Sequence, residues 1–271
     1  MGSSKTDNVV SIKSRQVSCK DCRLRKFCLA ADLNVEELGM FEGITQHRRL
    51  LERGSQVFHN GDRFNTLYTI RTGSLKTYTL TPDGREQITG FYLPGDLIGL
   101  DAMGSGIHGS SAEVLETTTL CAIPFNRMSS IQSKSIQQRL LKLASEQIQN
   151  RDRHITLLGK ESADQRLASL LVHFANRFKT LGYSAQQFNL SMSRADIGNY
   201  LNLAIETVSR VFAKLRSSGL INVDRRQLRI NNLEKLRCLA AAEIPKDIRN
   251  HMARDEFEPT FSVLTQVNNS T

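Results

Sequence analysis

Three of the five cysteines lie close together near the N-terminus, at Cys19, Cys22 and Cys28. The gap of two residues lets the first two sulfur atoms reach one metal centre from a tight turn, and the gap of five lets the chain pass around a larger group. Tetrahedral zinc usually takes two close pairs of ligands, whereas an iron–sulfur cubane spreads its ligands over four irons. Cys121, in an expected strand, is the candidate fourth ligand. The spacing therefore favours an iron–sulfur cluster, with zinc binding and thiol-based redox sensing as alternatives.

Basic side chains alternate with these cysteines, and only one acidic residue, Asp21, lies among them. The basic residues are Lys20, Arg23, Arg25 and Lys26. Positive neighbours lower the pKa of a thiol and offset the negative charge of bound thiolates. Because charged side chains seek water, we expect the site to be exposed. Cys238, in an expected helix near 236–240, is interpreted as a packed thiol without a function.

A second group of chemically informative residues lies between 190 and 230, where the pattern predicts a helix-turn-helix. Ser193 is a candidate N-cap of the first helix, with Asp196 reaching back to it. Asn202 suits the turn, because Asn tolerates a left-handed backbone better than most residues. The second helix is expected from Ile205 to Ser217, and Gly219 follows as its stop signal.

The second of these helices has one apolar side and one polar side. At 100° per residue, Val208, Val211, Phe212 and Leu215 share the apolar side, while Glu206, Ser209 and Arg210 point outward. Arg can donate two hydrogen bonds to guanine, and Glu can accept one from the amino group of cytosine. The alternative is a solvated face on which Glu206 and Arg210 form a routine ion pair.

The segment that follows favours the DNA-reading interpretation. Two apolar runs, 220–223 and 228–230, flank the basic tip 224–227 and predict a β-hairpin. The whole chain of 271 residues has 36 Lys and Arg against 27 Asp and Glu, which gives a formal net charge of +9. A helix-turn-helix followed by such a wing, in a basic protein, indicates binding to double-stranded DNA.

Upstream of this region, the sequence predicts elements that must position the cysteines. Between about 41 and 125, glycines separate short β-rich runs at Leu67–Arg71, Leu75–Leu80, Gln87–Leu93 and Ser111–Pro124. This pattern predicts a small antiparallel barrel or roll. From Ile131 onward the pattern is helical, and a further amphipathic helix is expected over 162–183.

The helix after Ile131 has a heptad pattern that predicts pairing with a second copy. Its seam consists of Leu141, Ala144, Ile148, Arg151, Ile155 and Leu158. Two copies of Arg151 would repel each other in a parallel dimer, which makes pairing marginal and suits a switch. The alternative is an amphipathic helix that packs only on its own barrel.

Several function classes lack support in the sequence. No apolar run reaches the roughly 18 residues of a membrane span, and no secretory signal precedes the cysteines, so we expect a cytoplasmic protein. The dinucleotide, phosphate-loop and Ser/His/Asp patterns of common enzymes are absent, so we expect no enzyme. Residues 93–113 contain Asp96 and Asp101 but no Arg or Lys. A buried cyclic nucleotide would leave its phosphate there without a cation, so we expect no cyclic nucleotide.

Together these motifs resemble a known family. The cysteine spacing, EQITGF at 86–91, LET at 115–117 before Cys121, DIGNYL at 196–201 and ETVSR at 206–210 resemble the oxygen-sensing FNR/ANR branch of the CRP/FNR superfamily. The resemblance covers roughly 17–245. It implies an α+β fold with an N-terminal cyclic-nucleotide-binding-like β-roll, a long dimerisation helix and a C-terminal winged helix-turn-helix.

The resemblance sets our expectation for domain boundaries. We expect a disordered N-terminus (1–16), a cysteine cluster-binding segment (17–40), the β-roll sensor domain (41–130), the dimerisation helix (131–160), the winged helix-turn-helix domain (161–245) and a flexible tail (246–271).

The resemblance also implies a function. Cys19, Cys22, Cys28 and Cys121 would bind one 4Fe-4S cluster per subunit. Without oxygen, the protein would form a homodimer and bind a TTGAT-N4-ATCAA-like palindrome, as an activator or repressor of transcription. Oxygen would convert the cluster to 2Fe-2S, separate the dimer and release the DNA.

Further residue roles follow from the resemblance. Glu206, Ser209 and Arg210 would read bases, and Ser193 and Thr207 are additional candidate DNA contacts. The loop 81–87 resembles a surface that contacts RNA polymerase, for which sigma and alpha subunits are the expected partners. The candidate contact residues are Pro82, Asp83, Gly84 and Arg85. The chain departs from the family pattern at Arg23, Arg85 and Arg151, each of which adds positive charge.

Overall fold

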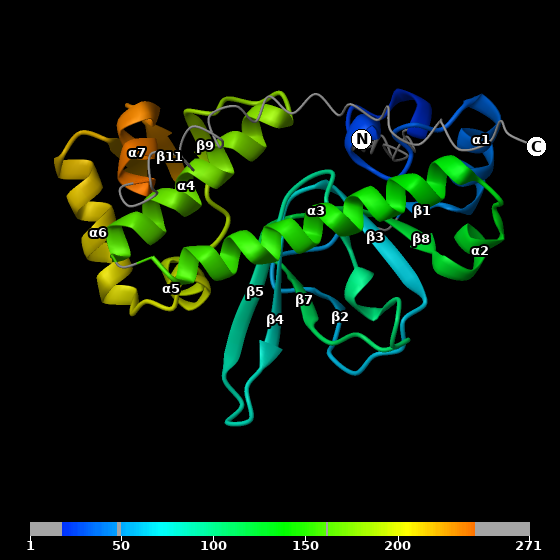
Figure 1. Ribbon diagram of the computed structural model, residues 1–271, viewed down its shortest axis with the longest axis horizontal. Coiled ribbons are helices and arrows are strands. Elements are labelled where there is room, and N and C mark those ends of the chain that lie inside the picture. The colour runs from blue at the N-terminus through cyan, green and yellow to red at the C-terminus, as the bar shows by residue number, and fades with distance from the viewer. Residues whose placement is uncertain (1–17, 48–49, 161, 242–271) are drawn as a thin grey trace, which may run out of the picture.

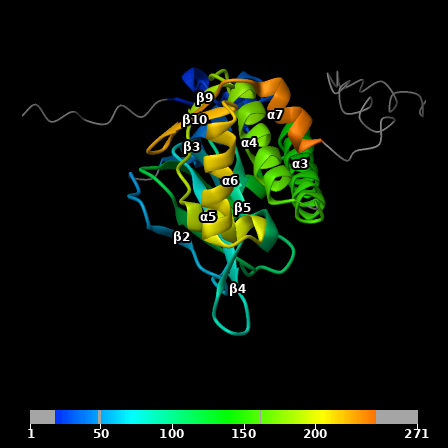
Figure 2. The same ribbon diagram turned by 90° about the vertical axis from the view of Figure 1, so that its left-hand side faces the viewer.

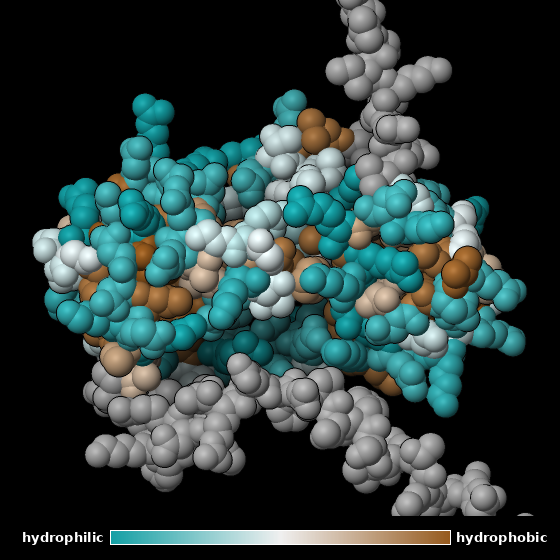
Figure 3. Space-filling model, turned by 90° about the horizontal axis from the view of Figure 1, so that it is seen from above, coloured by the Kyte–Doolittle hydropathy of each residue, from teal (hydrophilic) through white to brown (hydrophobic). Residues whose placement is uncertain are grey.

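The computed structural model describes residues 18–47, 50–160 and 162–241. In Figure 1 the long helix α3 (Lys134–Leu158) crosses the molecule, with the β-rich part beneath it. Helices α1 (Val35–Ile44) and α2 (Phe125–Ser130) lie at its right end, and the helices of the C-terminal part lie at its left end. The expectations for 1–16 and 246–271 lie outside the described residues. Seen from above, most of the described surface is hydrophilic, with small apolar patches at both ends (Figure 3).

The β-rich part consists of two antiparallel four-stranded sheets. One has the order β1-β8-β3-β6 and the other β2-β7-β4-β5. The strands are β1 (Gln46–His47), β2 (Gln56–Phe58), β3 (Thr66–Thr72), β4 (Leu75–Leu80), β5 (Glu86–Tyr92), β6 (Leu97–Ile98), β7 (Ser111–Val114) and β8 (Thr119–Pro124). Apolar side chains from both sheets, such as Ile70, Leu75 and Leu120, form the core between them. The expected β-roll is confirmed.

Two details of the roll differ from the sequence expectation. The run Ser111–Pro124 is two strands in different sheets, because the chain turns at 115–118 beside Gly73. A Cβ atom on Gly73, whose φ is +83°, would lie 2.2 Å from Thr118 Oγ1, so only glycine fits this approach. The stretch expected to be β-rich from about 41 begins instead inside helix α1 (Val35–Ile44), which Asn34 and Glu37 start with a capping box.

Helical structure begins before Ile131, where the sequence pattern predicted its start. Helix α2 (Phe125–Ser130) ends where Ile131 adopts an extended backbone, and α3 begins at Lys134 with Ser133 as its N-cap. One face of α3 packs on the roll and the N-terminal segment through Ile136 and Leu143. The seam residues Leu141, Ile148 and Ile155 are exposed and point away from this core, and pairing through them stays a prediction.

The C-terminal part is a winged helix-turn-helix, as expected. It contains α4 (Ala163–Thr180), β9 (Gln187–Asn189), α5 (Arg194–Leu201), α6 (Ile205–Ser217), β10 (Ile221–Asp224), β11 (Gln227–Ile230) and α7 (Leu233–Ala240). Ser193 and Asp196 form the capping box of α5, and Asn202 takes the left-handed conformation with φ of 52°. The sheet order is β10-β11-β9. Within the described ranges, no helix has the length and apolar character to cross a membrane.

A polar joint connects the roll to α5, which lies beside β5 (Figure 2). Lys76 on β4 forms an ion pair with Asp196 on α5 at 3.2 Å. Asn199 accepts a hydrogen bond from the Ile88 backbone N–H at 2.7 Å and donates one to the Glu86 carbonyl at 2.6 Å. These contacts fix the helix-turn-helix against the β4–β5 hairpin.

The turn between α5 and α6 leaves no room for a side chain at Gly198. A Cβ atom there would lie 2.7 Å from the Leu203 carbonyl oxygen. We expect Gly198→Ala to lower the free energy of unfolding by about 1–3 kcal/mol, the usual cost of overpacking. Gly39→Ala, in the exposed middle of α1 with nothing within 4 Å, should instead stabilise the protein by about 0.8–1 kcal/mol. Thermal unfolding of both variants measures the difference, and equal effects would contradict the close packing of this turn.

Candidate functional site

The cysteine segment is held in place by two short 3-10 helices and by α1. The helices are η1 (Cys19–Asp21) and η2 (Arg25–Phe27), and Cys28 follows directly after the second. Glu42 on α1 accepts hydrogen bonds from the Ser18 hydroxyl at 3.0 Å and from the Cys19 backbone N–H at 3.2 Å. The start of the segment is therefore anchored to a helix that precedes the roll.

Two arginines hold the end of the same segment by its carbonyl groups. Arg25 donates from Nη2 to the Leu33 carbonyl at 2.9 Å. Arg139, which is buried on α3, donates from Nε to the Cys28 carbonyl at 3.0 Å and from Nη2 to the Phe27 carbonyl at 2.7 Å. The cysteine segment is thus tied directly to the long helix.

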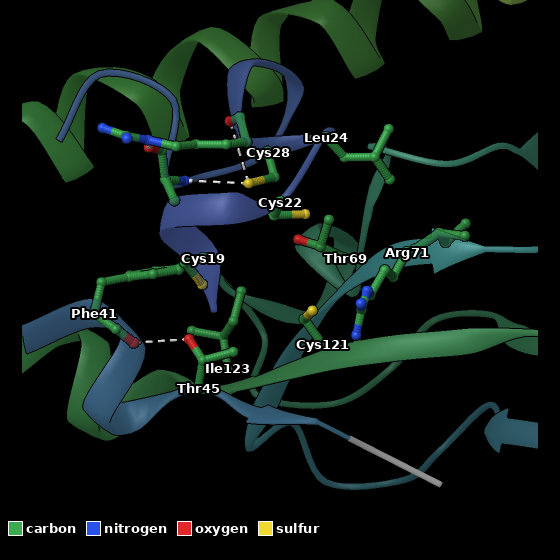
Figure 4. Close-up of a pocket in the computed structure, with 13 residues that line it drawn as sticks. Cys19, Cys22, Leu24, Cys28, Phe41, Thr45, Thr69, Arg71, Cys121 and Ile123 are labelled. Atoms are coloured by element: carbon green, nitrogen blue, oxygen red, sulfur yellow. Dashed lines mark hydrogen bonds between the residues drawn. The ribbon is translucent and has the colours of Figure 1, made fainter. Parts of the chain in front are cut away.

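Cys121 comes from a distant part of the chain and meets this segment at a common pocket. It lies on β8, the strand between β1 and β3, with Thr69 of β3 as its cross-strand partner. Cys19, Cys22 and Cys28 line the same pocket as Cys121 (Figure 4). The structure therefore brings together the four cysteines that the sequence singled out.

The environment of these thiols differs from the expectation of an exposed site with lowered pKa values. Burial raises the pKa of Cys19 to about 12, with the Glu42 carboxylate adding to the effect, and raises that of Cys121 to about 11. Burial also raises the pKa of Cys28. The interleaved basic residues do not offset this desolvation. At Cys121, Arg71 acts to lower the pKa. At Cys28, the backbone N–H of Ala30, which donates to the sulfur at 3.4 Å, lowers the pKa more than Arg139 does.

The four thiols around the pocket are the ligand type that iron–sulfur groups take. Among the described residues, no three His, Cys, Asp or Glu side chains are close enough to hold a single metal ion. A cubane takes each cysteine on a different iron, so its ligands surround a wider space. Four thiols around one pocket therefore fit an iron–sulfur cluster, whose positive irons would stabilise their thiolate forms.

Sequence reasoning missed the residues that support this pocket. Arg139 was hidden because an Arg in a helix is ordinarily solvent-exposed, and Thr69 and Glu42 belong to no motif. Position in the sequence is the signal that could have found two of them. Thr69 falls in an expected strand, and Arg139 lies three residues after the buried Ile136, on the same side of the helix. Cys238, interpreted as a packed thiol, is exposed on α7, because it lies on the face of that helix opposite the buried Leu236.

The candidate DNA-reading residues lie on α6. Glu206, Ser209 and Arg210 are exposed, while Val208, Val211, Phe212 and Leu215 are buried. Arg210 donates a hydrogen bond to Thr207 Oγ1 at 3.3 Å. Within the described part of the chain no ion pair joins Arg210 to Glu206, so both keep their charged groups available. The hydroxyl of Ser193 is engaged as the N-cap of α5.

The wing and the β4–β5 hairpin present further exposed residues. The wing tip contains Arg225, with a left-handed φ of 53°, and Arg226, and both are exposed. The hairpin containing 81–85 projects from the roll (Figure 1). At its tip Arg85 donates to Asp83 Oδ2 at 2.6 Å, which partly neutralises the positive charge of Arg85.

The outer face of α3 carries an apolar stripe at seven-residue intervals. Leu141, Ile148 and Ile155 are 71%, 61% and 68% exposed. Ala144 and Leu158 are half-buried, and Arg151 is exposed. Such a regular stripe on one helix is unusual for a surface that faces only water.

In residues 93–113, the stretch of the roll where a cyclic nucleotide would bind, Asp96 is paired with groups of this chain. Asp96 accepts a hydrogen bond from the Leu93 backbone N–H at 2.8 Å and forms an ion pair with Arg177, which α4 supplies. Residues 93–113 contain no Arg or Lys, and the cation beside Asp96 is Arg177 of α4. The charge of Arg177 is balanced by the Asp96 carboxylate.

Comparison with known proteins agrees with this architecture. The family described as the Crp-like helix-turn-helix domain matches residues 165–239, and the cyclic nucleotide-binding domain matches 48–135. The transcriptional activator protein Anr of Pseudomonas aeruginosa is 42% identical over 84% of this chain and 95% of its own length. The fumarate and nitrate reduction regulatory protein of Salmonella typhimurium is 39% identical over 83% of this chain and 90% of its own.

A solved structure shows the same overall fold. FixK2 from Bradyrhizobium japonicum superposes with a TM-score of 0.66 at 28% identity, covering 74% of this chain and all of that one. The relatives are transcription regulators rather than enzymes, and the Crp-like helix-turn-helix indicates DNA binding. On the strength of these matches and the architecture described above, the chain belongs to the FNR/Anr branch of the CRP/FNR family of transcription regulators.

Proposed function

We propose that this protein is an oxygen-responsive regulator of anaerobic transcription, in which Cys19, Cys22, Cys28 and Cys121 hold one 4Fe-4S cluster per subunit. The observation that carries the proposal is the convergence of these four cysteines, from two distant segments, on one pocket. When bound, the cluster would supply an iron–sulfur centre with which oxygen reacts. The names of the Anr and fumarate and nitrate reduction relatives support a role in anaerobic regulation.

Arg139 supplies a physical connection between the pocket and the proposed dimer surface. Its guanidinium holds the carbonyls of Phe27 and Cys28. Its helix, α3, presents Leu141 and Ile148 on the outer face. Because a helix transmits displacement as a rigid element, a change in the cysteine segment shifts or frees the face that a second copy would contact.

The exposed stripe on α3 supports a homodimer. Two copies that pair along Leu141, Ile148 and Ile155 would bury three apolar side chains each, while the two Arg151 side chains oppose association. A two-fold dimer would present two α6 helices to two half-sites. We propose that the target is a TTGAT-N4-ATCAA-like palindrome, read by Glu206, Ser209 and Arg210.

The projecting hairpin and residues 93–113 support proposals about RNA polymerase and cyclic nucleotides. The hairpin tip at 82–85 is proposed to contact RNA polymerase, through its sigma or alpha subunit. The ion pair of Asp96 with Arg177 supports a roll that works without a cyclic nucleotide, because it occupies charges that a phosphate and ribose would need. The protein is proposed to act in the cytoplasm, where DNA and polymerase are found.

The first prediction concerns the ligand set. Protein purified without air should be brown and contain iron and sulfide in equal amounts, near four of each per chain. Cys121→Ser should lose most of both, because a cubane with three thiolates is held weakly. Cys238→Ser makes the same change at an exposed cysteine outside the pocket and should keep full metal content. Iron and sulfide assays of the three proteins provide the measurement.

Two results would count against the ligand set. Colourless protein with one zinc and no sulfide would replace the sensor with a structural metal site. Full iron and sulfide in Cys121→Ser would remove Cys121 from the set while leaving the three N-terminal cysteines.

The second prediction concerns base reading. Arg210→Ala should weaken binding to the palindrome about tenfold or more, since a bidentate contact to guanine discriminates by about 1–3 kcal/mol. Binding to unrelated DNA should change little. Arg216→Ala removes the same charge from the exposed last turn of α6 and should leave the preference for the palindrome intact. Titrations of both DNAs at one salt concentration decide the matter, and an equal loss on both DNAs for Arg210→Ala would argue that Arg210 binds phosphate only.

The third prediction concerns the dimer surface. Ile148→Glu should raise the monomer–dimer dissociation constant at least tenfold, because it removes two apolar contacts of about 1.5–3 kcal/mol each and adds like charges. Gln149→Glu adds the same charge one residue away, at an exposed position outside the seam, and should have little effect. Sedimentation of air-free protein measures both. A dimer unaffected by Ile148→Glu would place the interface elsewhere.

A further inference from the structure

The side chain of Thr69 is an unexplained polar group in the cysteine pocket. Thr69 is 5% exposed and lines the pocket, yet its Oγ1 has no hydrogen-bond partner among the described residues. It faces Cys121 across the β3–β8 ladder. In Figure 4 its side chain lies between Cys22 and Cys121, with the hydroxyl oxygen turned toward the pocket.

Other threonines of the roll show that this situation is not typical of the fold. Thr72 pairs with Thr119 at 2.7 Å, and Thr77 pairs with Thr89 at 2.8 Å. A buried hydroxyl left unpaired destabilises a protein, so such groups nearly always find a partner. The absence of a protein partner at Thr69 indicates that the partner is something the pocket holds.

We propose that Thr69 donates a hydrogen bond to a sulfur atom of the iron–sulfur group, which is either the Cys121 thiolate or a bridging sulfide. The inference rests on the proposed function, since it requires the four cysteines to hold that group. Sulfur is the acceptor to be expected there, because the other side chains around Thr69 in the pocket are cysteines, cationic arginines and apolar residues, apart from Thr45, whose hydroxyl donates to the Phe41 carbonyl at 2.7 Å.

A hydrogen bond to a cluster sulfur has a defined chemical effect. It stabilises the more negative, reduced form of the group and so makes loss of an electron harder. Thr69 is therefore a positioning and tuning residue that slows the reaction of the loaded protein with oxygen. Thr69 is not a ligand of the iron–sulfur group, but its hydrogen bond sets how much oxygen is needed to release the DNA.

The test compares Thr69→Val, which keeps the shape and removes the donor, with Thr69→Ser, which keeps the donor. Wild type and both variants are purified without air, and iron and sulfide are counted first. The visible absorbance is then followed after mixing with buffer of known oxygen content. We expect Thr69→Val to bleach about two- to tenfold faster than wild type, the factor that a typical intramolecular hydrogen bond supplies. Thr69→Ser should bleach at nearly the wild-type rate.

Two further measurements separate a hydrogen bond from an effect on folding. In metal-free protein, Thr69→Val should unfold at the same temperature as wild type or higher, because it removes an unpartnered buried hydroxyl. In the loaded protein, resonance Raman spectra of wild type should shift in deuterium oxide, and the shift should be absent in Thr69→Val. A shift in the terminal iron–thiolate bands identifies Cys121 as the acceptor, and one in the bridging bands identifies a sulfide.

The outcomes distinguish this proposal from the one on which it rests. If all three proteins hold iron and sulfide but bleach at the same rate, with the same Raman bands, the role of Thr69 is overturned and the cluster remains. If wild-type protein prepared without air holds neither iron nor sulfide, the proposed function fails and the role of Thr69 fails with it. A lower unfolding temperature of metal-free Thr69→Val would overturn the proposal in favour of a structural role.

Discussion

The structure depends on enclosing sulfur atoms from two distant segments in a single, largely apolar pocket. Burial raises the pKa values of Cys19, Cys28 and Cys121, because a thiolate loses its hydration there. Basic neighbours in the sequence do not compensate for this loss. The multi-iron centre that we propose for this pocket would provide the positive charge that thiolates need in such a place. The pocket would then have a metal-free state and a loaded state, and we propose that the N-terminal segment responds to which of them is present.

Hydrogen bonds connect the cysteine segment directly to the long helix α3. Arg139 is buried on α3 and donates hydrogen bonds to two carbonyls of the cysteine segment, which ties that segment to the long helix. The same helix carries the apolar stripe on its outer face. Farther along, Lys76 and Asn199 fix α5 against the β4–β5 hairpin. Specific polar contacts therefore connect the cysteine pocket to α3 and the roll to α5.

Much of this arrangement could be predicted from local sequence signals. The capping box at Ser193, the bounds of α6, the left-handed Asn202 and the wing all depend on neighbouring residues, and the structure has them as expected. The division of 111–124 into strands of two sheets depends on the close approach of Gly73 to Thr118, which no local pattern reveals. The prediction of lowered pKa values for the cysteines was wrong for the same reason. Burial, which comes from the fold, raises these pKa values more than the nearby basic residues lower them. Arg139 and Thr69 matter only through contacts made across the fold.

We propose that the group held by the four cysteines controls the association of two chains. Sedimentation of one air-free sample, repeated at intervals after oxygen is admitted and compared with its visible absorbance, tests it most directly. The mass should correspond to two chains at the start and fall to that of one chain, about 30.4 kDa, in step with the loss of colour. A mass that stays constant while the colour disappears would contradict it.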